Sequence, residues 1–140
     1  MITDLGHPAF AAHHVERTFE FYGMRGIEDA FRVHKEGSLM LVYLHISGDC
    51  FIEVFPGGPP PDPDREQSFM HICLLTDGLH AAVEHLRENG APVDREPAVG
   101  LDGNWQAWTR DPDGNEIELM QLSESSPQWR SARSSERSGM

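Results

Sequence analysis

Two histidines and two glutamates in this sequence are of the residue types that bind a divalent metal ion. Glu53 and Glu118 each lie in a strand-like run that is otherwise mostly apolar. A carboxylate buried without a partner is costly enough to be driven towards its neutral form. Two such carboxylates therefore indicate a shared cation, to which His7 and His71 can add imidazole nitrogens.

These four residues occupy equivalent positions in an internal repeat. A shift of 64 residues places His7 on His71, and a shift of 65 places Glu53 on Glu118. Each residue alone has a more ordinary interpretation, because a strand histidine is usually a structural polar group and Glu118 could lie on the solvated face of an edge strand. Their joint position in both repeats favours the metal site over four independent coincidences.

The elements that must position these residues recur in both halves. Each half is predicted to run strand, helix, strand, strand, strand, because apolar residues at helical spacing follow each histidine and three strand-like runs come next. The helices are expected at 15–22 and 79–86, and the strands between helix and glutamate at 26–34, 39–46, 93–99 and 104–110. Glycine- and aspartate-rich turns between the later strands indicate antiparallel hairpins.

Strand alternation predicts the face of each ligand. It places Phe51, Glu53 and Phe55 on one face of the strand and Ile52 and Val54 on the other. If the halves are related by a pseudo-twofold axis, one His and one Glu from each converge as an N₂O₂ set that leaves two octahedral positions for water or substrate. Such ligands suit one divalent ion of nickel, cobalt, zinc, manganese or iron, without selecting among these metals.

The chain length of 140 residues fits one domain. We expect a single domain over residues 1–122, made of repeats at 2–56 and 68–122. The proline-rich segment 57–67 is expected to link the repeats, because proline cannot continue a sheet. Residues 123–140 are rich in Ser and Arg and lose periodicity, which predicts a flexible tail.

The composition excludes several partners. The net charge of −12 would repel a nucleic-acid backbone or an anionic membrane, and no apolar run is long enough to span a bilayer. Residues 1–5 carry no basic cluster typical of a leader, so a cytoplasmic location is expected. Cys50 and Cys73 lack metal or paired spacing and are expected to be reduced thiols, with a disulfide between them less favoured.

Other polar and aromatic residues are weaker candidates. Arg32 and Arg110 could hold an anionic substrate group, although surface arginines are at least as common an outcome. Trp105 and Trp108 are three residues apart on a strand, so they point to opposite faces and at most one lines the site. His80 and its neighbour on the same helix, His85, are five residues apart and do not predict a second metal site.

The repeated module resembles the vicinal oxygen chelate superfamily, which includes glyoxalase I, bleomycin resistance proteins and extradiol dioxygenases. The resemblance covers about residues 2–122 and is closest to glyoxalase I-like proteins. Its most specific pieces are Gly6-His7, Phe21-Tyr22 at the end of the first helix, Phe69 to Ile72, and the turn Asp111-Pro-Asp-Gly-Asn that leads to Glu118. It implies an α+β fold in which two tandem βαβββ modules form a curved mixed sheet around a metal-containing cavity, with helices on the outer face.

The resemblance also implies an activity. The nickel or cobalt type of glyoxalase I uses His, Glu, His and Glu, which correspond to His7, Glu53, His71 and Glu118. By this resemblance the chain is a metal-dependent lyase or isomerase of the lactoylglutathione lyase kind, acting on a small oxygenated substrate. Glu118 is the implied base, which takes a proton next to a carbonyl to give an enediolate that the cation stabilises, and Glu53 holds the metal or serves as a second base.

Two alternatives come from the same superfamily. A ferrous-iron ring-cleaving dioxygenase uses only His, His and Glu, so Glu53 argues mildly against it, while a metal-free drug-binding protein lacks the ligands altogether. Members of the superfamily commonly dimerise, which implies a homodimer. No residues mark a glutathione site, so the identity of the substrate and of any thiol cofactor stays open.

Overall fold

The computed structural model describes Met1, residues 5–67 and residues 69–138, with side chains of the last helix described to residue 134. The first residues of the two expected repeats, 2–4 and 68, and the end of the expected tail, 139–140, lie outside the described residues. The chain divides into two compact units. The first comprises Met1–Glu66 and Asp111–Gly114, and the second comprises Gln67–Arg110 and Asn115–Met140.

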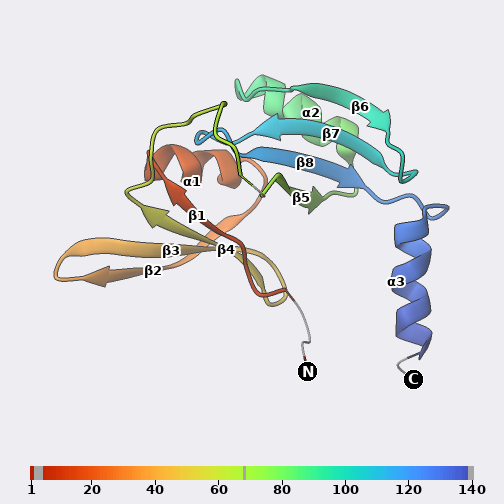
Figure 1. The fold of residues 1–140 in the computed structure, drawn as a ribbon, viewed down its shortest axis with the longest axis horizontal. Helices are drawn as coiled ribbons and strands as arrows, with labels where there is room; N and C mark the ends of the chain where they lie inside the picture. Colours follow the sequence, from red (N-terminus) through yellow and green to blue (C-terminus); the bar gives the residue numbers. More distant parts are fainter. Residues whose placement is uncertain (2–4, 68, 139–140) are drawn as a thin grey trace. The chain divides into compact units, whose positions relative to one another are not determined.

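Each unit contains one mixed four-stranded sheet and a helix between its first two strands, and the second unit also contains a C-terminal helix (Figure 1). The first sheet has the order β1-β4-β3-β2 and the second the order β5-β8-β7-β6. In both, the first strand is parallel to the fourth and the hairpin partners are antiparallel. The elements are β1 (Ala9–Ala12), α1 (Val15–Gly23), β2 (Glu28–Lys35), β3 (Ser38–Ser47) and β4 (Cys50–Pro56), then β5 (His71–Leu75), α2 (Leu79–Glu88), β6 (Arg95–Val99), β7 (Trp105–Arg110) and β8 (Glu116–Gln121). The two expected βαβββ modules are confirmed, with the predicted element ends within two residues.

The core of the first unit lies between α1 and one face of its sheet. Val42 and Leu44 on β3 and Ile52 and Val54 on β4 are almost fully buried there. Alternation along β4 turns Glu53 to the opposite face, as the sequence predicted. Burying one face on a helix therefore fixes which face presents the glutamate.

The turn Asp111–Gly114 packs on the first unit although it precedes β8. The buried Tyr22 hydroxyl donates to Asp111 Oδ2 at 2.9 Å, and the Thr18 hydroxyl donates to Asp113 Oδ2 at 3.1 Å. Burial, followed by the Asp111 carboxylate, holds the pKa of Tyr22 well above its ordinary value. These two hydrogen bonds make the turn part of the first unit.

The second unit repeats this arrangement with different side chains. Leu79, Val83 and Leu86 of α2 are buried, as are Ile117 and Leu119 on β8.

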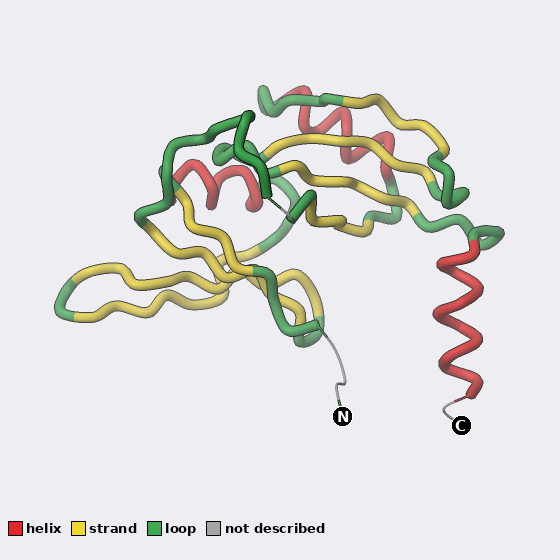
Figure 2. Tube along the Cα trace, viewed as in Figure 1, coloured by secondary structure: helices red, strands yellow, loops and turns green. Residues whose placement is uncertain are grey.

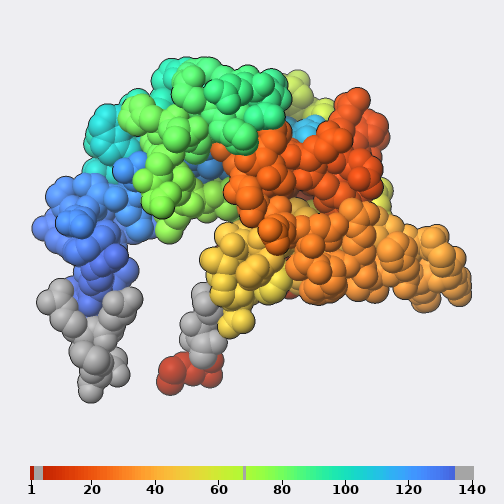
Figure 3. Space-filling model, turned by 180° about the vertical axis from the view of Figure 1, so that it is seen from behind, coloured from red at the N-terminus to blue at the C-terminus, as the bar shows by residue number. Residues whose placement is uncertain are grey.

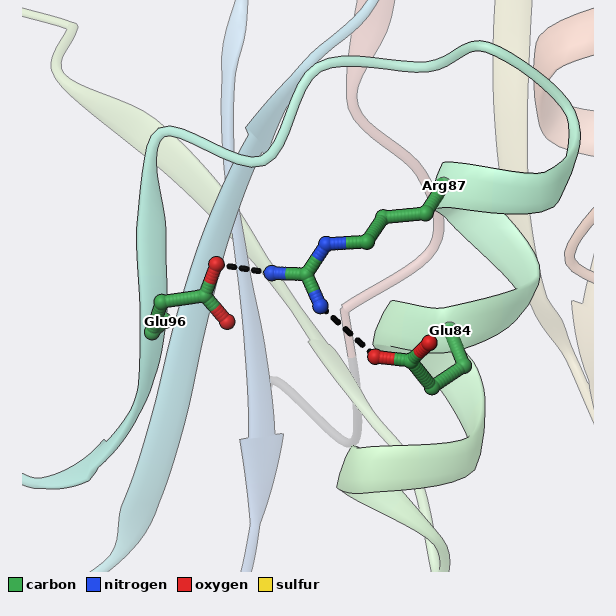
Figure 4. Close-up of polar contacts among 3 residues, drawn as sticks. All are labelled: Glu84, Arg87 and Glu96. Atoms are coloured by element: carbon green, nitrogen blue, oxygen red, sulfur yellow. Dashed lines mark hydrogen bonds and ion pairs between the residues drawn. The ribbon is translucent and has the colours of Figure 1, made fainter.

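On the surface of the second unit, Arg87 of α2 donates to Glu84 at 2.6 Å and also pairs with Glu96 on β6 (Figure 4). These side chains are exposed, so the contacts add at most about 1 kcal/mol while they tie the helix to the edge strand.

The segment expected to be a flexible tail contains a helix that was not predicted, α3 (Pro127–Ser138), which follows β8 (Figure 2). The buried Ser126 accepts a hydrogen bond on its Oγ from the Trp129 N–H at 3.1 Å, and Pro127 follows it as the first helical residue. This pattern is a helix start signal. The segment is rich in Ser and Arg and carries no apolar stripe, so the sequence pattern did not predict the helix.

Candidate metal centre

The first His–Glu pair is built where the chain enters β1. The Glu53 N–H donates to Pro8 O and the Phe51 N–H to Gly6 O, each at 3.0 Å, so β4 holds the backbone on either side of His7. The Nε2 atom of His7 lies 3.5 Å from Glu53 Oε1. The Glu53 side chain is 12 % exposed, which leaves its carboxylate mostly shielded from water.

The second pair has the same construction in the other unit. His71 opens β5, which runs parallel to β8 and pairs Cys73 with Glu118. The Nε2 atom of His71 lies 3.1 Å from Glu118 Oε2, and the Glu118 side chain is 9 % exposed. Each pair therefore joins the beginning of a module to its last strand.

An aromatic ring flanks each pair at the equivalent position. Tyr43 is the cross-strand partner of Glu53, and Trp108 is the partner of Glu118. The Tyr43 ring lies edge-on to His7 with centroids 5.1 Å apart, and the Trp108 ring lies edge-on to His71 with centroids 4.7 Å apart. Both rings restrict the imidazole that they touch.

These two aromatic residues were missed as a pair in the sequence. Tyr43 and Trp108 are related by the same shift of 65 residues that relates Glu53 to Glu118. The signal was therefore present, but it concerns residues that bind no metal. Trp105, as expected, lies on the other face, where it contacts His80 of α2.

The flanking rings differ in their polar contacts. The Tyr43 hydroxyl forms a hydrogen bond with Glu53, which is the main cause of a raised Tyr43 pKa. The indole N–H of Trp108 instead donates to Gln106 Oε1 at 3.2 Å. Both modules therefore place an aromatic ring beside the His–Glu pair, but only the ring of Tyr43 donates a hydrogen bond to its glutamate.

The donor set fits a divalent ion. Nitrogen and oxygen ligands about 2.1 Å from one metal lie roughly 3 Å apart when they are neighbours in its coordination shell. The separations within the two pairs, 3.5 and 3.1 Å, are close to that value. The four predicted residues are thus gathered as two pairs. No three His, Cys, Asp or Glu side chains form a single metal-sized group within residues 5–67 and 69–134, so convergence of the pairs on one ion stays a prediction.

The weaker candidates have partners of their own. Arg32 donates to Asp29 at 2.7 Å and lies over the Phe19 ring of α1, on the face opposite Glu53. Arg110 makes two hydrogen bonds to Asp94, at 2.7 and 3.0 Å. Cys50 and Cys73 are free thiols. These contacts assign the two arginines to ion pairs within their own modules.

Comparison with known proteins identifies the family. A model of the Glyoxalase/Bleomycin resistance protein/Dioxygenase superfamily matches residues 4–119. The chain therefore belongs to this superfamily. Among the helices in the described part of the chain, none is long and apolar enough to cross a membrane.

One curated relative is a protein from Synechocystis named "Probable lactoylglutathione lyase". It is 36 % identical over 61 residues, which cover 43 % of this chain and 47 % of the relative. The matched part thus spans about half the length of that relative.

Solved structures share the fold at lower identity. A glyoxalase family protein from Enterococcus faecalis has a TM-score of 0.70 and 22 % identity, over 84 % of this chain and 96 % of its own. A bleomycin resistance determinant encoded on the transposon Tn5 has a TM-score of 0.63 and 23 % identity, over 86 % and 99 % of the two chains. At these identities the likeness concerns the fold alone.

Proposed function

We propose that the chain is a metal-dependent lyase or isomerase of the glyoxalase kind, which moves a proton next to a carbonyl on a small oxygenated substrate. The observation that carries this proposal is the recurrence of a shielded His–Glu pair at equivalent positions of both modules. The partial match to a probable lactoylglutathione lyase supports the same chemistry.

In this proposal His7, Glu53, His71 and Glu118 hold one divalent ion of nickel, cobalt, zinc, manganese or iron. The bound ion supplies Lewis-acid stabilisation for negative charge on the substrate oxygens. Shielded carboxylates suit this role, because their charge needs a cation when water is largely excluded.

Glu118 is proposed as the base. Its carboxylate would take the proton from a carbon that bears a hydroxyl and lies next to a carbonyl, and the electron pair of the broken C–H bond would form a C=C bond as the carbonyl oxygen gains charge. Return of that proton to the former carbonyl carbon, with loss of the hydroxyl proton as the first carbon becomes the new carbonyl and gain of a proton by the former carbonyl oxygen, would complete an isomerisation without any external oxidant. Glu53 is held by the Tyr43 hydroxyl and is proposed mainly as a ligand.

The test combines metal analysis with turnover. Purified protein is stripped with a chelator, loaded with each candidate ion and assayed with methylglyoxal and a thiol. Glu118→Gln should lower kcat by roughly 100-fold or more, as expected for loss of a general base. Glu53→Gln should lower metal affinity by about 10-fold or more.

Matched controls are Glu20→Gln on α1 and Glu88→Gln on α2, which make the same chemical change on exposed helix positions. Metal content in Glu53→Gln equal to that of the parent would contradict the four-ligand set. Oxygen uptake that needs only ferrous iron would favour the dioxygenase alternative, and failure to bind any metal would favour a drug-binding protein.

We further propose a homodimer that takes a small-molecule substrate, as the superfamily resemblance implies. Light scattering at two protein concentrations measures the mass directly. A monomeric mass at both concentrations would contradict the dimer and leave the proposed chemistry unaffected.

A further inference from the structure

Three aromatic rings lie side by side on the sheet face that carries Glu53. The rings of Phe31 on β2 and Tyr43 on β3 are stacked, with centroids 4.6 Å apart and planes 14° apart. Phe51 on β4 meets Tyr43 edge-on at 5.8 Å. Phe31, Tyr43 and Phe51 therefore form a continuous surface, called here the aromatic wall, which begins at His7.

The wall leaves apolar area in contact with solvent. Phe31 is 48 % exposed, and every residue of β2 is exposed along its length. The β2–β3 hairpin extends past the other two strands of its sheet (Figures 1 and 3). Since exposed aromatic rings beside a shielded polar pair are unfavourable in water, a bound apolar group would gain free energy by covering them.

The strand positions paired with the three rings carry no cation. Phe31 pairs with Tyr43, which pairs with Glu53, and Phe51 pairs with His45, so none of these partners is Lys or Arg. Arg32 is the cross-strand partner of the buried Val42, on the face that carries α1. The aromatic wall itself therefore offers no cation to a carboxylate group such as those of glutathione.

We propose that the aromatic wall binds an uncharged aromatic group of the substrate, next to the oxygens that the His7–Glu53 pair and its metal would hold. This inference rests on the proposed function and adds the substrate class, an aryl-substituted compound with two neighbouring oxygens. A flat ring can stack on the exposed side of Phe31 and meet Phe51 edge-on, the two arrangements that aromatic pairs prefer.

Hydroxamates test this proposal without turnover, because they present two neighbouring oxygens and undergo no proton transfer at carbon. Benzohydroxamate and acetohydroxamate are titrated by calorimetry into the metal-loaded protein. Benzohydroxamate should bind at least about 10-fold tighter, and Phe31→Ala should reduce its affinity roughly 3- to 10-fold with little effect on acetohydroxamate.

Met40→Ala is the matched control, since Met40 is similarly exposed on the same hairpin and is not one of the three rings of the wall. It should change neither affinity. Phe31→Leu keeps an apolar side chain without the ring. Its affinity for benzohydroxamate should lie between the affinities of the parent and of Phe31→Ala.

The outcomes separate the wall from the proposed chemistry. Equal affinity for both hydroxamates in metal-loaded protein would overturn the wall and leave the metal site standing. The wall can also be tested in metal-free protein, by saturation transfer to the phenyl protons of benzohydroxamate. Transfer in the parent that disappears in Phe31→Ala supports the wall, even where metal uptake fails. No transfer in the parent overturns it. If Phe31→Ala instead halves the particle mass and abolishes no binding, the wall is an interface between two copies.

Discussion

Trp108 lies edge-on to the imidazole of His71, with ring centroids 4.7 Å apart and planes at 78°. The same residue is the cross-strand partner of Glu118, so one indole borders both members of the second His–Glu pair. Tyr43 has the same two relationships with His7 and Glu53. The repeat therefore includes a ring that limits how far each imidazole can turn away from its carboxylate.

The first prediction concerns this ring. Trp108→Ala should lower the affinity for the divalent ion about 10-fold, the order of effect found when groups that orient a ligand are removed. Trp108→Phe retains an aromatic edge and should stay within about 3-fold of the parent. Competition with a chromophoric chelator measures both affinities. A Trp108→Ala protein with parental metal affinity would show that the ring does not orient His71.

The second prediction isolates the phenol of Tyr43. Tyr43→Phe keeps the ring against His7 and removes only the hydroxyl that bonds to Glu53. Metal affinity should fall by about 10-fold, because a hydrogen-bonded carboxylate ligand loses the group that orients it. Trp108→Phe serves as the comparison, since the Trp108 N–H donates to Gln106 and not to Glu118. An equal response of the two variants would contradict the asymmetry between the halves.

The sequence predicted the modules well for a definite reason. Both the order of elements and the positions of the two His–Glu pairs follow from one repeat of about 64 residues, and alternation along β4 gave the face of Glu53. Tyr43 and Trp108 follow the same repeat, but they were not predicted because aromatic residues are not among the residue types that bind a divalent metal ion. Whether the pairs meet at one ion depends on the packing of one module on another, which strand and helix periodicity does not encode.

Helix α3 illustrates a different limit. Its sequence is rich in Ser and Arg, so it lacks the apolar stripe by which α1 and α2 were predicted. The start signal Ser126-Pro127 was readable, and the Arg133 guanidinium lies 3.7 Å from the centroid of the Trp129 ring. A helix cap or a single side-chain contact is therefore a weaker sequence signal for a helix than an apolar periodicity.

The third prediction tests that cap. Ser126→Ala removes the acceptor for the Trp129 N–H and should destabilise α3 by about 1 kcal/mol. Hydrogen exchange at the α3 amides should accelerate by roughly 5-fold, while the amides of β7 and β8 keep their rates. Ser125→Ala, outside the helix, is the control. Unchanged exchange in Ser126→Ala would show that α3 does not depend on its N-terminal serine.

The fourth prediction follows from the buried Tyr22 hydroxyl. Its pKa is raised, first by burial and then by Asp111, whereas in the unfolded chain it titrates near about 10. Above that pH the unfolded state has lost the Tyr22 proton that the folded state keeps, so the free energy of unfolding falls as pH rises. Tyr22→Phe should lessen this alkaline loss, although at pH 7 it costs about 1–3 kcal/mol because Asp111 loses a buried donor.

Urea unfolding at pH 7 and at pH 11 separates the two effects of Tyr22→Phe. Tyr43→Phe is the control, because Tyr43 lies on the partly exposed face of its sheet and has no contact with the Asp111 turn among its described partners. The difference in unfolding free energy between the two pH values should shrink in Tyr22→Phe and change less in Tyr43→Phe. The same difference in the parent and in Tyr22→Phe would mean that the hydroxyl ionises as freely in the folded chain as in the unfolded one, and that the Asp111–Gly114 turn does not shield it.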